Sequence, residues 1–327
     1  MRSLKTHNRL LIFLLLALAL ACVAAPWMAL GADWTAAHWP ALLSERVPFR
    51  RIFNRAFMLA SMVLFFFLRR HLISTEIKAL LAVPVAPARR NFFAGFGLAL
   101  VSVALLLAVM TAADVYTPFF RLSLGRALGR LASALASGLF AGFLEEIFFR
   151  GILFLGILRS GGTVKAYLLA NLFYAALHFI KPSEQYFLDR LDVWAGFRHL
   201  LTTFKPFLDP LELLPGMTGL FLLGVVLSYA LARTGNLYLS IGLHAGWIVA
   251  IRSVRIVGDF SRQDLGWAFG STDPKIVSGV VTWIGVLLVA LAVRQLTRPR
   301  SPLSSDGTLA TIDRRRRGKE ARRETQK

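Results

Sequence analysis

The chain has 327 residues, of which 56% are hydrophobic and only 17% are charged, and its mean hydropathy is +0.59. This composition excludes an ordinary soluble globule and is typical of a polytopic membrane protein. A net charge of +20 would suggest nucleic acid in a soluble protein, but here Arg and Lys crowd the segments between apolar runs, as in cytoplasmic loops. No nucleic-acid partner is expected, because no exposed aromatic residues accompany these charges. The single cysteine, Cys22, excludes a disulfide framework and a cysteine-based zinc site.

Hydropathy along the chain predicts an all-α fold, a membrane helix bundle of about eight spans. The first apolar run is longer than the core of a signal peptide, so we expect it to be retained as a span. The fourth span is broken by Ser160-Gly161-Gly162. The predicted spans are residues 10–31, 52–68, 92–112, 131–158, 164–180, 217–232, 237–256 and 277–293.

The segments between the spans carry the topology signals. The loop after the second span contains Lys78, Arg89 and Arg90 and is a cytoplasmic candidate. Residues 183–215 form the longest polar insertion, and their periodicity leaves an external loop, an amphipathic cap and a re-entrant segment open. Residues 298–327 hold ten basic and four acidic residues, which predicts a disordered, solvated tail.

An even number of spans places both termini on one side, and their basic character predicts the cytoplasm. The arginines between residues 46 and 55 are the main contrary signal. We expect an integral protein of a bacterial inner (plasma) membrane. Its predicted divisions are amino-terminal helices at 1–125, a core at 126–256, a last span at 257–297 and the tail at 298–327.

One predicted span contains three charged residues, Glu145, Glu146 and Arg150. Each would cost roughly 2.5–3.5 kcal/mol at the bilayer centre, so their presence calls for a reason. Glu146 and Arg150 are four residues apart on one helix face and are expected to pair. Glu145 points about 100° away and is the better candidate for chemistry. The alternative is an ion-paired helix end near the headgroups that performs no chemistry.

Two of the six histidines, His178 and His244, lie within predicted spans. Asn171 and Tyr174 share a helix face with His178. A single membrane histidine is usually an interhelical contact. Two of them with Glu145 nearby indicate proton handling, in which one group activates water and another stabilises an oxyanion.

Three sequence blocks resemble the CPBP family, which includes CAAX prenyl endopeptidase-like, Abi-type and bacteriocin-processing intramembrane proteases of the glutamic type. The blocks are Glu145-Glu146-x-x-x-Arg150, then Tyr174-x-x-x-His178, then Phe221-x-x-Gly224 leading to Thr234-Gly235-Asn236 and His244. The resemblance covers about residues 138–249. It implies a CAAX-protease-like core in which Glu145 and His178 activate the attacking water and His244 stabilises the oxyanion. Glu146 and Arg150 would be the supporting members.

The chain departs from the family pattern at two positions. Tyr174 stands where the family has Phe, which adds a hydroxyl. Ile248 stands where the family usually has Asn, and isoleucine cannot donate a hydrogen bond to an oxyanion. Deleting one such donor costs on the order of 10²–10³ in rate. Asn171 or the indole of Trp247 could take its place.

The resemblance leaves metal dependence open. Glu145, His178 and His244 could hold zinc with an open water position. The chain has no His-Glu-x-x-His motif that would require zinc, so we favour a mechanism without a metal.

The resemblance implies an intramembrane endopeptidase that cleaves a membrane-embedded or lipid-anchored protein or peptide. One alternative is a pseudoprotease, a membrane scaffold or immunity protein, which would suit Ile248. Another is a proton-coupled transporter. The chain shows no inverted repeat of the kind that many transporters contain.

Overall fold

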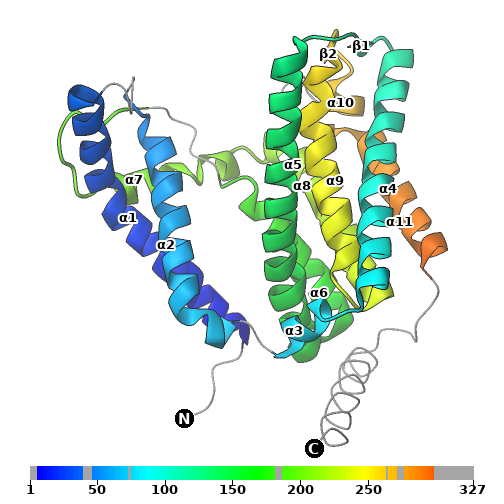
Figure 1. The fold of residues 1–327 in the computed structure, drawn as a ribbon, viewed down its shortest axis with the longest axis horizontal. Coiled ribbons are helices and arrows are strands. Elements are labelled where there is room, and N and C mark those ends of the chain that lie inside the picture. Colours follow the sequence, from blue (N-terminus) through cyan, green and yellow to red (C-terminus); the bar gives the residue numbers. More distant parts are fainter. Residues whose placement is uncertain are drawn as a thin grey trace, which may run out of the picture. The chain divides into compact units, whose positions relative to one another are not determined.

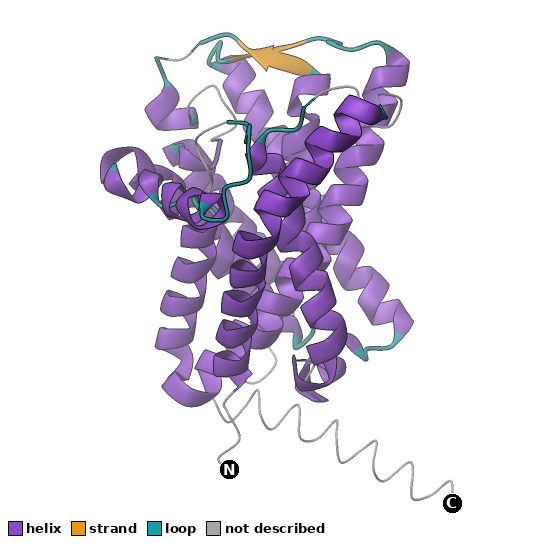
Figure 2. Ribbon diagram, turned by 90° about the vertical axis from the view of Figure 1, so that its left-hand side faces the viewer, coloured by secondary structure: helices purple, strands orange, loops and turns teal. Residues whose placement is uncertain are grey.

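The computed structural model describes residues 6–39, 46–72, 75–180, 186–262, 264–270 and 276–297. Nearly all of these residues are helical, and two short strands pair at one end of the helices (Figure 2). The predicted all-α fold class is therefore confirmed. The predicted disordered tail, residues 298–327, lies outside the described residues.

Five helices in the described part of the chain are long and apolar enough to cross a membrane, which makes this a multi-pass membrane protein. They cover Ile12–His38, Phe49–Leu68, Val85–Ala112, Pro210–Thr234 and Tyr238–Ile256. A shorter apolar helix covers Val280–Leu296. The fourth and fifth predicted spans fall on a further helical segment that contains the charged motif.

The chain divides into two compact units, and each is described by itself. Unit 1 comprises residues 1–74 and 176–213. Its elements are α1 (Thr6–His38), α2 (Phe49–Leu72), α7 (Ala195–Thr202) and the 3₁₀ helix η2 (Lys205–Leu208). Small alanines of α1 pack against the phenylalanines of α2. Gly196 of α7 lies so close to the Cys22 carbonyl that no Cβ would fit there.

Unit 2 comprises residues 75–175 and 214–327 and contains the charged motif. Its longer helices run beside one another (Figure 1), and they are α4 (Val85–Ala112), α5 (Leu124–Glu146), α8 (Pro210–Thr234, in this unit from residue 214), α9 (Tyr238–Ser253) and α11 (Val280–Leu296). A π-helix, η1 (Ile147–Phe154), continues α5 into α6 (Leu155–Leu177). The short helices are α3 (Thr75–Leu81), η3 (Val254–Ile256), α10 (Gly266–Phe269) and η4 (Ile276–Ser278).

Helix α9 lies at the centre of unit 2, and glycines let its neighbours approach it closely. A Cβ on Gly242 would lie 2.1 Å from the carbonyl oxygen of Phe92 on α4. A Cβ on Gly95 of α4 would lie 2.4 Å from the Leu239 carbonyl. On the α5 side, a Cβ on Gly138 would lie 2.8 Å from the Ala245 carbonyl. Close backbone contact of this kind is how membrane helices associate without a hydrophobic driving force.

The strands β1 (Tyr116–Pro118) and β2 (Gly258–Phe260) form an antiparallel pair at one end of unit 2. They tie the segment after α4 to the segment after α9. The Tyr116 hydroxyl donates a hydrogen bond to the Val254 carbonyl (2.7 Å), and Arg121 pairs with Asp259 (3.0 Å). Hydropathy did not predict this pair, because each strand has only three residues.

Several helix boundaries differ from the sequence expectation. Helix α4 begins at Val85 rather than Phe92, since prolines in the first turn of a helix cost no hydrogen bond. The insertion at 183–215, whose form periodicity left open, contains α7, η2 and the first turns of α8. The predicted break at Ser160-Gly161-Gly162 is confirmed, because Gly162 adopts φ 81° and kinks α6.

Candidate active site

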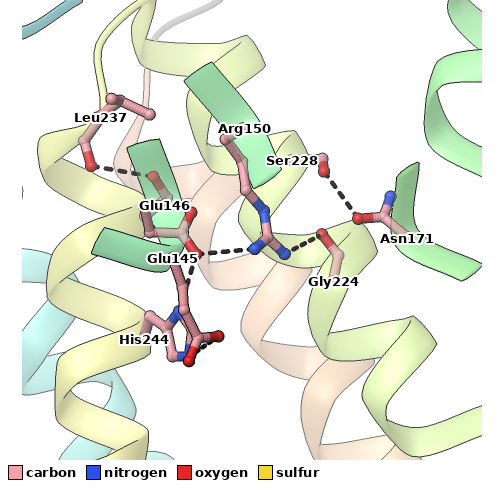
Figure 3. A network of polar contacts seen from close by, with 9 residues as sticks. Glu145, Glu146, Arg150, Asn171, Gly224, Ser228, Leu237 and His244 are labelled. Atoms are coloured by element: carbon pink, nitrogen blue, oxygen red, sulfur yellow. Dashed lines mark hydrogen bonds and ion pairs between the residues drawn. The ribbon is translucent and has the colours of Figure 1, made fainter. Parts of the chain in front are cut away.

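Glu146 and Arg150 form a fully buried ion pair at the junction of α5 and η1. Both side chains have 0% exposure, and Arg150 Nη1 donates to Glu146 Oε1 at 2.8 Å (Figure 3). The other terminal nitrogen, Nη2, donates to the Gly224 carbonyl of α8 at 3.1 Å. The i, i+4 spacing predicted the ion pair. The hydrogen bond to the Gly224 carbonyl could not be predicted in this way, because it depends on how α8 packs against η1. Bringing two charges out of water is tolerable only when they compensate each other in this way.

His244 of α9 shares the same carboxylate oxygen. Its Nδ1 lies 2.8 Å from Glu146 Oε1, and its side chain is 6% exposed. Because that oxygen also accepts a hydrogen bond from Arg150, Glu146 is the acceptor and Nδ1 carries the proton. Glu146 therefore fixes the orientation of the imidazole and holds a proton on Nδ1, a role that a carboxylate often has beside a functional histidine.

The second ring nitrogen of His244 faces Glu145. The distance from Nε2 to Glu145 Oε2 is 3.7 Å, close enough for charge attraction but too long for a direct hydrogen bond. The Glu145 side chain is 34% exposed, in contrast to the sealed Glu146. Of the two adjacent carboxylates, Glu145 is thus the one that a substrate or water can reach.

Local helix geometry contributes to this arrangement. The helix changes from α to π directly after Glu146, and the wider turn continues to Phe154. Single π turns are rare and occur frequently at functional sites. No pattern in the sequence predicted this change from α-helix to π-helix.

Tyr174 of α6 closes the cluster on another side. The guanidinium carbon of Arg150 lies 4.6 Å from the centre of the Tyr174 ring, and the ring meets His244 edge-on at 6.1 Å between centroids. Tyr174 is 2% exposed. A desolvated cation over an aromatic face gains about 2 kcal/mol, so this ring helps to offset the burial of Arg150.

The two residues expected to replace the missing oxyanion donor are engaged elsewhere. Asn171 is buried, donates to the Tyr167 carbonyl at 2.8 Å and accepts from the Ser228 hydroxyl at 3.0 Å. The single N–H of Trp247 donates to Ser102 Oγ at 3.1 Å. Ile248 itself is half-buried on α9.

His178 lies in the turn directly after α6 and is half-buried. It belongs to unit 1, whereas the other predicted site residues belong to unit 2. The structure therefore brings Glu145, Glu146, Arg150 and His244 together, and it leaves the expected pairing of Glu145 with His178 untested. The catalytic roles of all these residues stay predictions.

Two contributors were missed by sequence reasoning. Gly224 belongs to a motif quoted above, but its role as the carbonyl that receives Arg150 was not foreseen. A Cβ there would lie 2.9 Å from Asn171 Oδ1 and 3.1 Å from the Tyr174 ring, so α8 can approach only with glycine. Ser228, one turn further along α8, is fully buried and donates a hydrogen bond to Asn171. Gly224 and Ser228 are a small and a polar residue four positions apart in an apolar helix, and this spacing could have predicted a helix contact there.

Among the described residues, no group of three His, Cys, Asp or Glu side chains is arranged to hold a metal ion. In the cluster of unit 2, one nitrogen of His244 and one oxygen of Glu146 already bind each other. A zinc site would require His178 beside Glu145 and the free Nε2 of His244.

Fold and cluster together define a multi-pass helical membrane protein with a buried arginine, a buried histidine and two adjacent carboxylates. Residues 127–250 match the model of the family described as type II CAAX prenyl endopeptidase Rce1-like. The match confirms the resemblance of this part of the chain to the CPBP family and supports a protease-type enzyme. No curated protein and no solved structure matches the chain.

Proposed function

We propose that the protein is an intramembrane endopeptidase that hydrolyses a peptide bond with Glu145 as general base and His244 as the partner of the developing oxyanion. The observation that carries this proposal is the Glu145 side chain, 34% exposed, beside a histidine whose other nitrogen is fixed by Glu146. The Rce1-like match supports the reaction class.

In the proposed reaction, Glu145 accepts a proton from water while the water oxygen attacks the peptide carbonyl carbon. The carbonyl oxygen becomes an oxyanion, and Nε2–H of His244 donates a hydrogen bond to it. When the carbon–nitrogen bond breaks, the proton on Glu145 passes to the leaving nitrogen. The products are a carboxylic acid and an amine, the acid then gives its remaining proton to the amine or to water, and Glu145 returns to its starting form.

This role requires His244 to carry protons on both ring nitrogens, since Nδ1 donates to Glu146. The charges of the cluster are consistent with an imidazolium. Two carboxylates then face one guanidinium and one imidazolium, so a mostly buried site has no net charge. A neutral His244 would leave the cluster with one uncompensated negative charge.

The family resemblance adds His178 as a second group that orients the water, and we retain this as part of the proposal. The proposed substrate is a membrane-embedded or lipid-anchored protein or peptide, and the proposed location is a bacterial inner membrane with both termini in the cytoplasm. The proposed reaction uses Glu145, His178 and His244 without a metal ion.

Ile248 favours a second candidate, a pseudoprotease that binds a membrane partner without cleaving it. Its side chain has no hydrogen-bond donor at the position where relatives carry Asn. The candidates differ in one respect, since only the protease needs the Glu145 carboxylate for chemistry.

The test compares membrane-protein termini by quantitative proteomics in cells that carry the wild type, Glu145→Gln or the control Glu212→Gln. Glu212 is an exposed glutamate at the start of α8, so its loss should change nothing. We expect a precursor to accumulate uncut with Glu145→Gln alone. Unchanged termini, with the variant inserted at wild-type levels, would refute the protease and favour the pseudoprotease.

A further inference from the structure

Unit 2 carries an open apolar groove that the proposed chemistry does not use. Its volume is about 510 Å³, and it lies between the amino-terminal turns of α4, the second half of α5 and the start of α9. Its lining includes Val85, Arg89, Phe93, Leu139, Phe143 and Ile241. Apart from Arg89 and Tyr238, the described residues that line it are apolar.

We propose that this groove binds an anionic phospholipid, with one acyl chain against the apolar lining and the headgroup phosphate at Arg89. The proposal goes beyond the proteolytic function, since it assigns a lipid site that needs none of the cluster residues. The volume lies within the range of small-ligand pockets, about 300–1,000 Å³.

Hydrocarbon is the occupant that the lining favours. Phe93, Leu139 and Phe143 are 59%, 44% and 42% exposed, so they present apolar surface to whatever fills the groove. An extended peptide would bring backbone N–H and C=O groups that need hydrogen-bond partners. The Tyr238 hydroxyl already donates to the Leu81 carbonyl, which leaves little to satisfy such a backbone. An acyl chain has no polar group to satisfy.

The charge of the occupant follows from Arg89. It is exposed, lies near the amino end of α4 and is the charged member of the lining. Lys78 and Arg90 stand close to it in the sequence. Basic residues beside a groove between membrane helices attract anionic headgroups, whereas a zwitterionic headgroup gains less. Arginine also binds phosphate through two parallel hydrogen bonds.

The groove ends close to the cluster. Phe143 lies one helical turn before Glu146, and Ile241 lies one turn before His244. A bound chain would therefore pack against the same turns of α5 and α9 that position the carboxylate and the imidazole. The bound lipid would therefore occupy one defined position in the fold, whereas the lipids around the rest of the surface would not.

The experiment uses the full chain in nanodiscs that contain phosphatidylglycerol or phosphatidylcholine with a diazirine on the acyl chain. Crosslinked peptides are mapped by mass spectrometry. We expect labelling of residues 83–93 and 139–143 to favour phosphatidylglycerol about five-fold, the ratio that about 1 kcal/mol from one basic residue gives. Arg89→Gln should remove this preference. Arg90→Gln is the matched control and should retain it, because Arg90 is equally exposed but does not line the groove.

A second pair of variants tests the acyl chain. Leu139→Trp should fill the groove and lower labelling by both lipids, while Phe140→Trp, at the next exposed position of α5, should not. Equal labelling by the two lipids would overturn the proposal. It would also be overturned by a phosphatidylglycerol preference that survives Arg89→Gln, or by one that Arg90→Gln lowers as much.

Discussion

Among the side chains whose burial the structure describes, each unit has one buried histidine, and the surroundings of the two differ. In unit 1, His199 is fully buried among aromatic rings, with Phe49, Phe53 and Tyr186 at 5.0–5.7 Å between ring centroids. In unit 2, His244 lies between two carboxylates, 2.8 Å from Glu146 and 3.7 Å from Glu145. Burial alone therefore does not make a histidine a candidate for catalysis. The adjacent carboxylates single out His244, because one accepts a hydrogen bond from Nδ1 and the other can accept a proton.

The largest expected effect comes from removing the Glu146 carboxylate, which contacts both His244 and Arg150. Glu146→Gln leaves a fully buried guanidinium without its carboxylate, which costs about 3–5 kcal/mol when a buried pair is broken. We expect a large loss of stability in a denaturation assay in detergent. The double variant Glu146→Gln with Arg150→Met should recover much of this stability but no activity. Recovery of both would show that the pair does not position His244.

The comparison of the two histidines is tested directly by substituting each. His244→Gln should lower activity per folded molecule by about 10²–10³, the usual cost of losing one oxyanion donor. His199→Gln should lower the thermal stability of the protein and leave the activity of the folded fraction unchanged. Activity is measured on a precursor identified by the terminal proteomics, and the folded fraction by size-exclusion chromatography. Equal activity losses in the two variants would remove the distinction between them.

The position of His244 also depends on how closely α9 lies against α4. Gly242→Ala places a Cβ about on top of the Phe92 carbonyl, at 2.1 Å, so the two helices must move apart. Overpacking of this kind costs about 1–3 kcal/mol. Gly97→Ala is the matched control on α4, since nothing lies within 4 Å of its Cβ. The melting temperature of Gly242→Ala should be clearly lower than that of Gly97→Ala. Identical melting temperatures would contradict the close approach of α9 to α4.

The smallest effect is expected at Asn171. Its contact to Ser228 links α6 to α8, and its contact to the Tyr167 carbonyl lies within α6, so Asn171→Ala should cost about 1 kcal/mol of stability. Because its amide is engaged there, we expect activity to remain near the wild-type level. Full activity would end the hypothesis that Asn171 replaces the missing oxyanion donor, while a loss of 10²-fold at unchanged stability would support it. Kinetics and thermal unfolding of one preparation measure both quantities.

Hydropathy was sufficient to predict the membrane class and the helices, because a span needs only length and apolar composition. Helix spacing was sufficient to predict the Glu146–Arg150 pair, since residues four apart always share a face. Neither hydropathy nor helix spacing predicts short helices and strands. The β1–β2 pair and the helices of the 183–215 insertion escaped prediction, because three to eight residues carry too little periodicity.

Composition and helix spacing are enough to show which residues carry charge in an apolar helix and that Glu145 and Glu146 point in different directions. Helix packing is needed to know that Glu146 holds His244, that Glu145 keeps 34% of its side chain exposed beside it, and that Gly224 receives Arg150. These contacts join Glu146 and Arg150 to residues of α9 and α8 that lie 98 and 74 residues further along the chain. Local periodicity fixes the face on which a side chain lies, whereas the partner of that face is set by helix packing.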